Sequence, residues 1–208
     1  MKPSSTGRRV FGLILAAGQS RRMGQCKQLL PYKDGTIIEA VIQPVLESSL
    51  DGLVIVANPQ VERFLRGYLP EQCFLALNDD PESEMLDSVR IGLGVIKDDF
   101  EAAPNDGVMV LLGDQPQLTG GVITTCAEAY RLPRKQSGIL TATYKGRRGH
   151  PTIFSVDLLQ EIEDWPPERR LSDLMDDHAD AVRKLPITSC PMPTDIDTPE
   201  DYDRLRPI

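Results

Sequence analysis

Apolar segments with two different periods alternate along the first half of the chain. Continuous aliphatic and β-branched runs predict buried strands, and apolar residues spaced three or four apart predict helices. Strands are expected at residues 10–15, 53–57, 73–77 and 108–112. Helices are expected between them at residues 37–48, 61–68 and 85–96, the first with Thr36 as N-cap. This alternation predicts a mostly parallel sheet with helices on both faces.

The second half of the chain is less regular but continues the same architecture. Helices are expected at residues 121–130, 156–161 and 171–177, and strands at 138–144 and 181–185. Residues 133–137 have the composition of a loop. We therefore predict a single three-layer, Rossmann-like α/β domain over residues 8–208, preceded by a flexible tail at residues 1–7. The first strand is apolar along its whole length, which predicts that it lies inside the sheet and not at an edge.

The first strand runs directly into a loop that carries glycines and cations. Residues 15–27 read L-A-A-G-Q-S-R-R-M-G-Q-C-K. Ligands of open α/β sheets bind at the carboxyl ends of the strands. Gly18 and Gly24 allow the backbone to approach a phosphate closely, and Arg21, Arg22 and Lys27 supply positive charge. The loop thus predicts a site for a nucleotide polyphosphate.

Two better-known phosphate loops do not fit this segment. A Walker loop places Lys and Ser or Thr directly after its second glycine, whereas Gly24 is followed by Gln25 and Cys26. A dinucleotide fingerprint has the spacing G-x-G-x-x-G, which the segment lacks. Both P-loop chemistry and dinucleotide-dependent redox chemistry are therefore disfavoured.

The overall charge argues for a small anionic ligand and against a polymer. The 208-residue chain has a net charge of −8, and nucleic-acid surfaces need basic patches. No segment approaches the roughly 20 apolar residues of a membrane span, so no membrane association is expected. The four cysteines are widely spaced, without the pattern of a zinc site. We expect a cytoplasmic protein with reduced thiols.

Carboxylates at two distant positions predict a magnesium site. Asp114 follows the strand at 108–112 and should face the glycine loop. Asp195 and Asp197 lie on one face if their segment is extended. Magnesium uses one or two carboxylates together with substrate phosphates. Alternatively, Asp197 is the N-cap of a helix that begins with Thr198.

Four motifs together resemble a known family. The loop motif L-A-A-G-x-S-x-R-M-G-x-x-K is followed by L-L-P, and the others are L-L-G-D-Q-P at 111–116, R-G-H-P at 148–151 and D-I-D-T-P-E-D-Y at 195–202. The chain is similar to nucleotidyltransferases of the nucleotide-diphospho-sugar transferase-like fold. It most resembles the molybdenum cofactor cytidylyltransferases and their guanylyltransferase relatives.

The resemblance implies an activity and a role for each motif residue. CMP would pass from CTP to a molybdopterin-type acceptor with release of pyrophosphate, and a molybdoenzyme would receive the product. Lys27 and Arg22 would stabilise the phosphates, and Asp114 with Asp197, preferred over Asp195, would bind Mg²⁺. The expected nucleotide-binding set is Leu15, Ala16, Ala17, Gly18, Ser20, Arg21, Arg22, Gly24, Lys27, Ser88 and Arg90.

Three questions stay open at the level of sequence. The methyl group of Ala17 favours CTP, but a guanylyltransferase remains the alternative. The acceptor is a molybdopterin-type phosphate or a sugar or alcohol phosphate, and a non-catalytic nucleotide- or cofactor-binding chaperone is a further alternative. His150 either orients a turn before Pro151 or lines the acceptor pocket together with Arg148.

Overall fold

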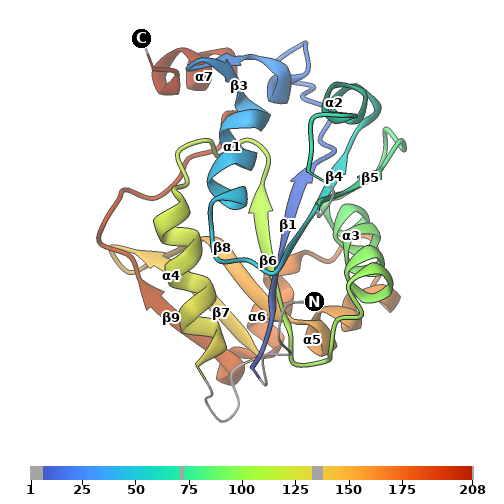
Figure 1. Cartoon of the computed structure of the whole chain (residues 1–208), viewed down its shortest axis with the longest axis vertical. Coiled ribbons are helices and arrows are strands. Elements are labelled where there is room, and N and C mark those ends of the chain that lie inside the picture. The colour runs from blue at the N-terminus through green and yellow to red at the C-terminus, as the bar shows by residue number, and fades with distance from the viewer. Residues whose placement is uncertain (1–6, 71–72, 133–137, 208) are drawn as a thin grey trace.

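A computed structural model describes residues 7–70, 73–132 and 138–207. The tail predicted at residues 1–7 lies outside these ranges except for Gly7, and so does the loop predicted at 133–137. The described residues form one α/β domain built on a seven-stranded sheet (Figure 1). None of its helices combines the length and the apolar character needed to span a membrane.

The sheet has the order β5-β4-β1-β6-β8-β7-β9. Its strands are β1 (Val10–Ala16), β4 (Gly52–Ala57), β5 (Cys73–Leu77), β6 (Gly107–Leu112), β7 (Ile139–Tyr144), β8 (Arg147–Ser155) and β9 (Val182–Pro186). Strand β1 pairs in parallel with β4 on one side and β6 on the other. The interior position predicted for the first strand is confirmed.

Strand β8 corrects the sequence-based interpretation, which placed no strand there. It is antiparallel to both β6 and β7, whereas the other strand pairs described in the seven-stranded sheet are parallel. The tight turn comes earlier, at Lys145 and Gly146, where φ is +50° and +80°. His150 therefore lies within a strand, and its interpretation as a turn histidine is wrong. The strand begins with the polar residues Arg147 and Arg148, so its first half lacks the apolar pattern that predicts a buried strand.

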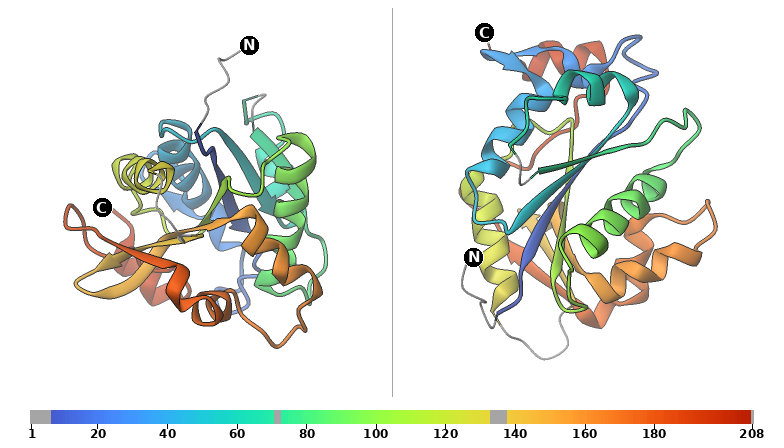
Figure 2. Two further views of the ribbon diagram at one scale, coloured as in Figure 1. Left: turned by 90° about the horizontal axis from the view of Figure 1, so that it is seen from below. Right: turned by 45° about the vertical axis from the view of Figure 1, so that its right-hand side comes forward.

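Helices cover both faces of the sheet, which confirms the three-layer prediction (Figure 2). One face packs against α1 (Ile37–Leu46), α2 (Pro59–Leu65) and α4 (Gly120–Arg131), and the other against α3 (Met85–Asp99), α5 (Val156–Gln160) and α6 (Leu171–Asp177). The structure also describes α7 (Pro199–Leu205), the hairpin strands β2 (Pro31–Tyr32) and β3 (Gly35–Thr36), and the 3-10 turns η1 (Lys27–Leu29), η2 (Glu161–Asp164) and η3 (Ala179–Ala181). Thr36 caps α1 as predicted, in a capping box with Glu39.

A third, smaller apolar cluster fastens the C-terminal segment to the glycine loop. Its buried members are Met23, Leu30, Tyr32, Ile37 and Ile196, with Tyr202 and Leu205 of α7 packed against them. Helix α7 accordingly lies beside β3, at the end of the molecule where α1 begins (Figure 1). This packing brings residues near position 197 next to residues near position 23.

Gly113 lets the end of β6 approach β1 closely. Its amide donates to the carbonyl oxygen of Leu15 over 2.9 Å. A Cβ atom at this position would lie 2.9 Å from the same oxygen and 2.9 Å from Ala16 Cβ. Backbone atoms cannot yield as a flexible side chain would, so the position requires glycine.

We expect Gly113→Ala to lower the free energy of unfolding by about 1–3 kcal/mol, the usual cost of overpacking. Gly121→Ala is the matched control, because a Cβ there meets nothing within 4 Å. Urea denaturation of both variants measures the difference. Equal stability of the two variants would show that the contact between β1 and β6 does not require glycine.

Candidate functional site

The loop after β1 has a fixed shape that delivers Lys27 to the edge of the sheet. Ser20 and Gly24 both adopt positive φ, at 51° and 67°. The Ser20 hydroxyl accepts a hydrogen bond from the Lys27 amide at 3.1 Å, and the Ser20 carbonyl accepts one from the Met23 amide at 2.9 Å. Met23 is buried in the third apolar cluster. The loop is thus closed by its own hydrogen bonds and anchored by one apolar side chain.

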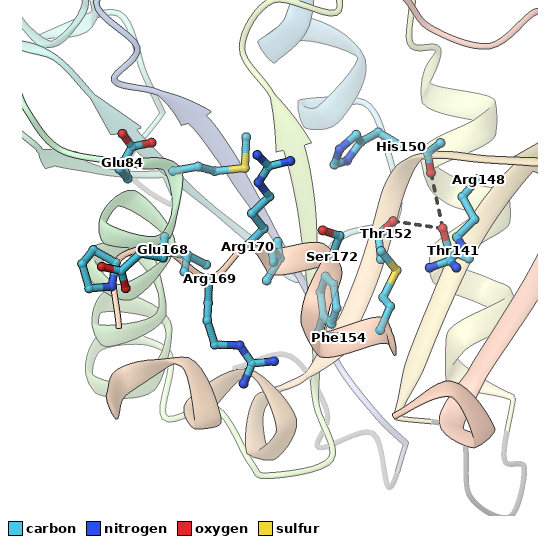
Figure 3. A pocket seen from close by; sticks show the side chains of 16 residues that line it. Glu84, Thr141, Arg148, His150, Thr152, Phe154, Glu168, Arg169, Arg170 and Ser172 are labelled. Carbon is cyan, nitrogen blue, oxygen red and sulfur yellow. Dashed lines mark hydrogen bonds between the residues drawn. The ribbon is translucent and has the colours of Figure 1, made fainter. Parts of the chain in front are cut away.

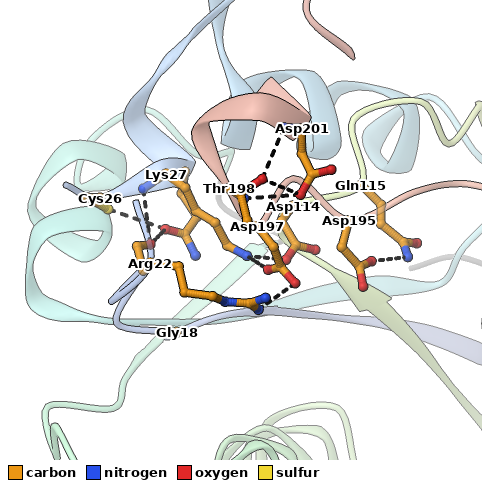
Figure 4. A network of polar contacts seen from close by, with 12 residues as sticks. Gly18, Arg22, Cys26, Lys27, Asp114, Gln115, Asp195, Asp197, Thr198 and Asp201 are labelled. Carbon is orange, nitrogen blue, oxygen red and sulfur yellow. Dashed lines mark hydrogen bonds and ion pairs between the residues drawn. The ribbon is translucent and has the colours of Figure 1, made fainter. Parts of the chain in front are cut away.

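The Lys27 ammonium joins two carboxylates that are distant in sequence (Figure 4). Its Nζ lies 2.5 Å from Asp114 Oδ2 and 2.7 Å from Asp197 Oδ1. The second oxygen of Asp197 pairs with Arg22 Nη2 at 2.7 Å. The side chain of Lys27 is only 10% exposed. The structure therefore brings together the four residues expected to bind phosphate and metal.

A backbone contact places the C-terminal carboxylates at the end of β6. The amide of Ile196 donates to the Asp114 carbonyl at 3.2 Å, and the Ile196 side chain is fully buried. Asp195 and Asp197 flank it, and both line the same cavity. Asp195 accepts a hydrogen bond from Gln115 Nε2 at 2.7 Å, whereas Asp197 contacts the cations.

Asp197 is not the N-cap of α7, so the capping alternative is wrong. Thr198 caps the helix: its hydroxyl accepts from the Asp201 amide at 3.2 Å, and the Asp201 carboxylate accepts from the Thr198 amide at 3.2 Å. Pro199 occupies the first turn in either arrangement, and the threonine next to it is also a good cap. The Asp197 carboxylate is consequently available to the cluster.

The charges of the cluster shift one another's pKa values. Burial alone would lower the pKa of Lys27, but the charges and hydrogen bonds of Asp114 and Asp197 outweigh burial and raise it. Burial raises the pKa of Asp114, although Lys27 opposes this effect. The pKa of Asp197 is lowered, because Lys27 and Arg22 outweigh the effect of burial. Lys27 is therefore protonated at neutral pH.

The donor set fits a divalent cation that is shared with a phosphate ligand. Asp114 Oδ1 is buried and has no hydrogen-bond partner among the described residues. A hard cation such as Mg²⁺ binds preferentially to oxygen ligands such as this carboxylate oxygen. In the described part of the chain, no group of three or more His, Cys, Asp or Glu residues is arranged to hold a metal by itself. Asp114 and Asp197 would need substrate oxygens and water to complete a coordination shell.

A cavity of about 480 Å³ opens beside the cluster. It is lined by Leu15, Ala17, Gly18, Arg22, Lys27, Gln28, Ser83, Glu84, Met85, Ser88, Leu112, Asp114, Asp195 and Asp197. An adjoining groove of about 300 Å³ shares Gly18, Arg22, Lys27 and Asp197 with the cavity and adds Ser20 and Arg21. Ligand pockets typically measure roughly 300–1,000 Å³. The combined space suits a nucleoside triphosphate.

Three of the predicted nucleotide-binding residues lie away from this cavity. Arg90 is held by the carbonyls of Ile162 and Trp165, at 3.0 and 2.7 Å, so its guanidinium braces α3 against the chain after α5. Ala16 is buried in the sheet core. Gly24 lines a separate neighbouring cavity of about 530 Å³. The other predicted members line the cavity or its groove.

Asn78 supports one wall of the cavity and was not predicted from the sequence. Its side-chain amide donates to the hydroxyls of Ser83 and Ser88, at 2.7 and 2.9 Å. Asn78 directly follows β5, so the rule that identified Asp114 at the end of β6 could also have found it. Gln28, which accepts a hydrogen bond from Ser20, gave no comparable signal.

A second cavity of about 660 Å³ adjoins the first and contains both predicted acceptor residues (Figure 3). The two cavities share Glu84 and Met85 as lining residues. His150 Nδ1 lies 3.3 Å from the Val110 carbonyl oxygen, and burial lowers the pKa of His150. Its imidazole is therefore neutral at neutral pH. Arg148 pairs with Asp176 at 3.1 Å.

Relatives with assigned names cover most of the chain. The purine catabolism protein PucB of Bacillus subtilis is 29% identical over 95% of this chain and 96% of its own length. The molybdenum cofactor cytidylyltransferase of Escherichia coli is 27% identical over 91% of this chain and 92% of its own length. The molybdenum cofactor guanylyltransferase of Mesorhizobium japonicum is 31% identical over 82% of this chain and 80% of its own length.

Solved structures share the whole fold. Rv0371c of Mycobacterium tuberculosis superposes with a TM-score of 0.80 and 27% identity, covering 97% of this chain and 99% of that chain. A manganese complex of the same protein gives a TM-score of 0.77 at 25% identity over the same shares of the two chains. A sequence model of the MobA-like NTP transferase domain matches residues 12–182. This chain belongs to the MobA-like NTP transferase family and is a nucleotidyltransferase.

Proposed function

We propose that this nucleotidyltransferase transfers CMP from CTP to a phosphate-bearing acceptor of the molybdopterin type and releases pyrophosphate. The observation that carries the proposal is the Lys27 ammonium held between Asp114 and Asp197 at the mouth of a nucleotide-sized cavity. The named activity of the cytidylyltransferase and guanylyltransferase relatives supports the acceptor class. The product would then pass to a molybdoenzyme.

The glycine loop would hold the triphosphate. An added Cβ at Gly18 or Gly24 would meet no atom closer than 4.0 Å, so the space above the loop is open to a ligand. Arg22, which is 67% exposed, can turn from Asp197 to the β- and γ-phosphates. Lys27 is less mobile because it is buried between two carboxylates. It would therefore remain close to the α-phosphate.

The transfer step needs no covalent intermediate with the protein. An oxygen of the acceptor phosphate forms a bond to the α-phosphorus, the bond from that phosphorus to the bridging oxygen breaks, and pyrophosphate leaves with the bonding electrons. Positioning and charge stabilisation supply most of the catalysis in reactions of this kind. Protonated Lys27 would stabilise the negative charge that grows on the α-phosphate.

Asp114 and Asp197 would hold the divalent cation. The buried, unpartnered oxygen of Asp114 and the position of both carboxylates beside Lys27 support this assignment. Bound there, Mg²⁺ would neutralise the charge on phosphate oxygens during transfer. The manganese complex of the M. tuberculosis relative is consistent with a divalent cation in this fold.

The adjoining cavity would receive the acceptor. Neutral His150 can exchange hydrogen bonds with a polar heterocycle, and the apolar side chains of Phe154 and Met175 line the same space. Arg148 would contribute positive charge on the β8 side of the cavity. The acceptor would reach the nucleotide past Glu84 and Met85, which the two cavities share.

Preference for CTP rests on Ala17. Its side chain lines the nucleotide cavity, where a methyl group reduces the space over the base and favours a pyrimidine. A guanylyltransferase is the second candidate, since the guanylyltransferase relative is 31% identical to this chain. The two assignments differ in the base alone and share every phosphate contact.

We expect Mg²⁺ to be required and Asp114→Asn to lower turnover by at least roughly 100-fold, because removal of the charge weakens the metal site. Pyrophosphate release is measured with and without EDTA, alongside thermal unfolding. Asp180→Asn, on an exposed residue, is the matched control. Turnover of Asp114→Asn close to that of the wild type would show that Asp114 does not bind the metal.

Lys27→Ala is expected to reduce kcat by about 10²- to 10³-fold, the typical cost of losing one preorganised donor. Nucleotide affinity should fall less, because charge on the α-phosphate increases in the transition state. Single-turnover rates and calorimetric binding separate the two effects, and Lys184→Ala, at an exposed position of β9, is the control. Equal losses in rate and affinity would indicate general electrostatic attraction.

The wild type should prefer CTP. Ala17→Gly should lower the ratio of kcat/KM for CTP to kcat/KM for GTP by roughly 10- to 200-fold, the range for a group of methyl size. The measurement is kcat/KM for all four ribonucleotides with a molybdopterin-type acceptor, in both proteins. Preference of the wild type for GTP would reverse the base assignment. Activity with a sugar phosphate alone would reverse the acceptor assignment.

A further inference from the structure

Three arginines line the acceptor cavity, and they differ in the partners that their guanidinium groups already have. Arg148, Arg169 and Arg170 come from β8 and from the segment that leads into α6. A phosphate-bearing acceptor needs a cation that is free to exchange water for phosphate oxygens. The existing partners of each guanidinium decide which of the three can take that role.

Arg148 and Arg169 are already engaged. Both terminal nitrogens of Arg148 bond Asp176 Oδ1, at 3.1 and 3.2 Å. Arg169 stacks on the Trp165 ring with its guanidinium carbon 3.5 Å from the ring centroid, and it pairs with Asp177. A phosphate would have to displace a carboxylate from either guanidinium.

Arg170 differs from Arg148 and Arg169 in the contacts of its guanidinium. Its backbone amide bonds the Asp173 carboxylate at 2.9 Å, but within the described residues no hydrogen bond or ion pair engages its guanidinium. The side chain extends into the cavity, and in Figure 3 the guanidinium lies between Glu84 and His150. Glu84 also lines the nucleotide cavity, so Arg170 points to the junction of the two spaces.

We propose that Arg170 binds the reacting phosphate of the acceptor and holds it at the junction of the two cavities. The assignment rests on the proposed function, because it concerns the phosphate that attacks the nucleotide. Lys27 and Arg22 are expected to bind the triphosphate, which leaves Arg170, among the described arginines of the acceptor cavity, as the one whose guanidinium has no partner. Glu84 and Glu168 also line this cavity. Their negative charges would repel a phosphate and leave Arg170 as its attachment point.

The acceptor class follows from the rest of the lining. Phe154, Leu171 and Met175 provide an apolar wall, while Thr141 and Thr152 contribute hydroxyls 3.1 Å apart. A planar, partly polar ring that carries a monophosphate would pack against the apolar wall and bind Arg170 through its phosphate. Arg170 would fix the phosphate, and the wall would fix the ring.

The test compares Arg170→Gln and Arg170→Lys with Arg147→Gln. Arg147 is an exposed β8 arginine that does not line the cavity, so it controls for the loss of one positive charge. Phenyl phosphate serves as a binding probe in calorimetry, and kcat/KM for the acceptor is measured at saturating CTP. Because the Arg170 side chain bonds nothing in the described part of the protein, the melting temperature of both variants should match that of the wild type.

We expect Arg170→Gln to weaken phenyl phosphate binding and to lower kcat/KM for the acceptor, each by about 10- to 100-fold, as for a lost hydrogen bond to a charged group. The KM for CTP should not change in Arg170→Gln. Arg170→Lys should recover part of the lost phenyl phosphate affinity and acceptor kcat/KM. For Arg147→Gln, both quantities should stay within about twofold of the wild type, as expected for a surface charge.

The outcomes separate this assignment from the proposed function. Normal acceptor turnover in Arg170→Gln would overturn the role of Arg170 and leave the transferase activity intact. If the wild type transfers CMP to no phosphate acceptor, yet phenyl phosphate binding still falls in Arg170→Gln, the proposed function fails and the phosphate site stands. Equal weakening in Arg170→Gln and Arg147→Gln, or no binding of the probe to the wild type, would overturn the assignment.

Discussion

The ion pairs of Lys27 with Asp114 and Asp197 are the interaction on which the site depends. They join the loop after β1, the end of β6 and the segment before α7, three parts of the chain that are far apart in sequence. Charges in such a partly buried place are costly unless they are paired. Without a ligand, Lys27 therefore stays between the two carboxylates, and this pairing fixes the relative positions of all three segments.

Apolar packing makes that electrostatic arrangement possible. Met23 holds the glycine loop and Ile196 holds the C-terminal segment, and both belong to the third apolar cluster. Ile196 lies between Asp195 and Asp197, so burial of one side chain presents both carboxylates to the cavity. Gly113 allows β6 to end close enough to β1 for Asp114 to reach Lys27. Hydrophobic burial positions the segments, and the ion pairs then define the chemistry of the site.

Periodicity and strand-end position predicted most of this structure from sequence. The α6 range 171–177 was correct, and β1 lies inside the sheet. Strand β8 was missed because its polar first half resembles a turn, and antiparallel pairing with β6 overrides that local signal. Asp197 and Thr198 are both good caps, and only tertiary contacts show that Asp197 pairs with Lys27 while Thr198 caps the helix. Arg90 was expected at the nucleotide from the family resemblance, whereas its guanidinium bonds the carbonyls of Ile162 and Trp165, because a motif does not reveal which carbonyls a long side chain can reach.

The same ion pairs impose a condition on the proposed reaction. In the structure, the two cations Lys27 and Arg22 balance the two carboxylates Asp114 and Asp197. A triphosphate that attracted both cations would leave the carboxylates without partners, at a cost in free energy. A divalent cation held by Asp114 and Asp197 would remove this cost, because it would supply the positive charge that Lys27 and Arg22 then direct to the phosphates. Under the proposed function, nucleotide and metal binding are therefore coupled: each ligand supplies the counter-charge that the other displaces.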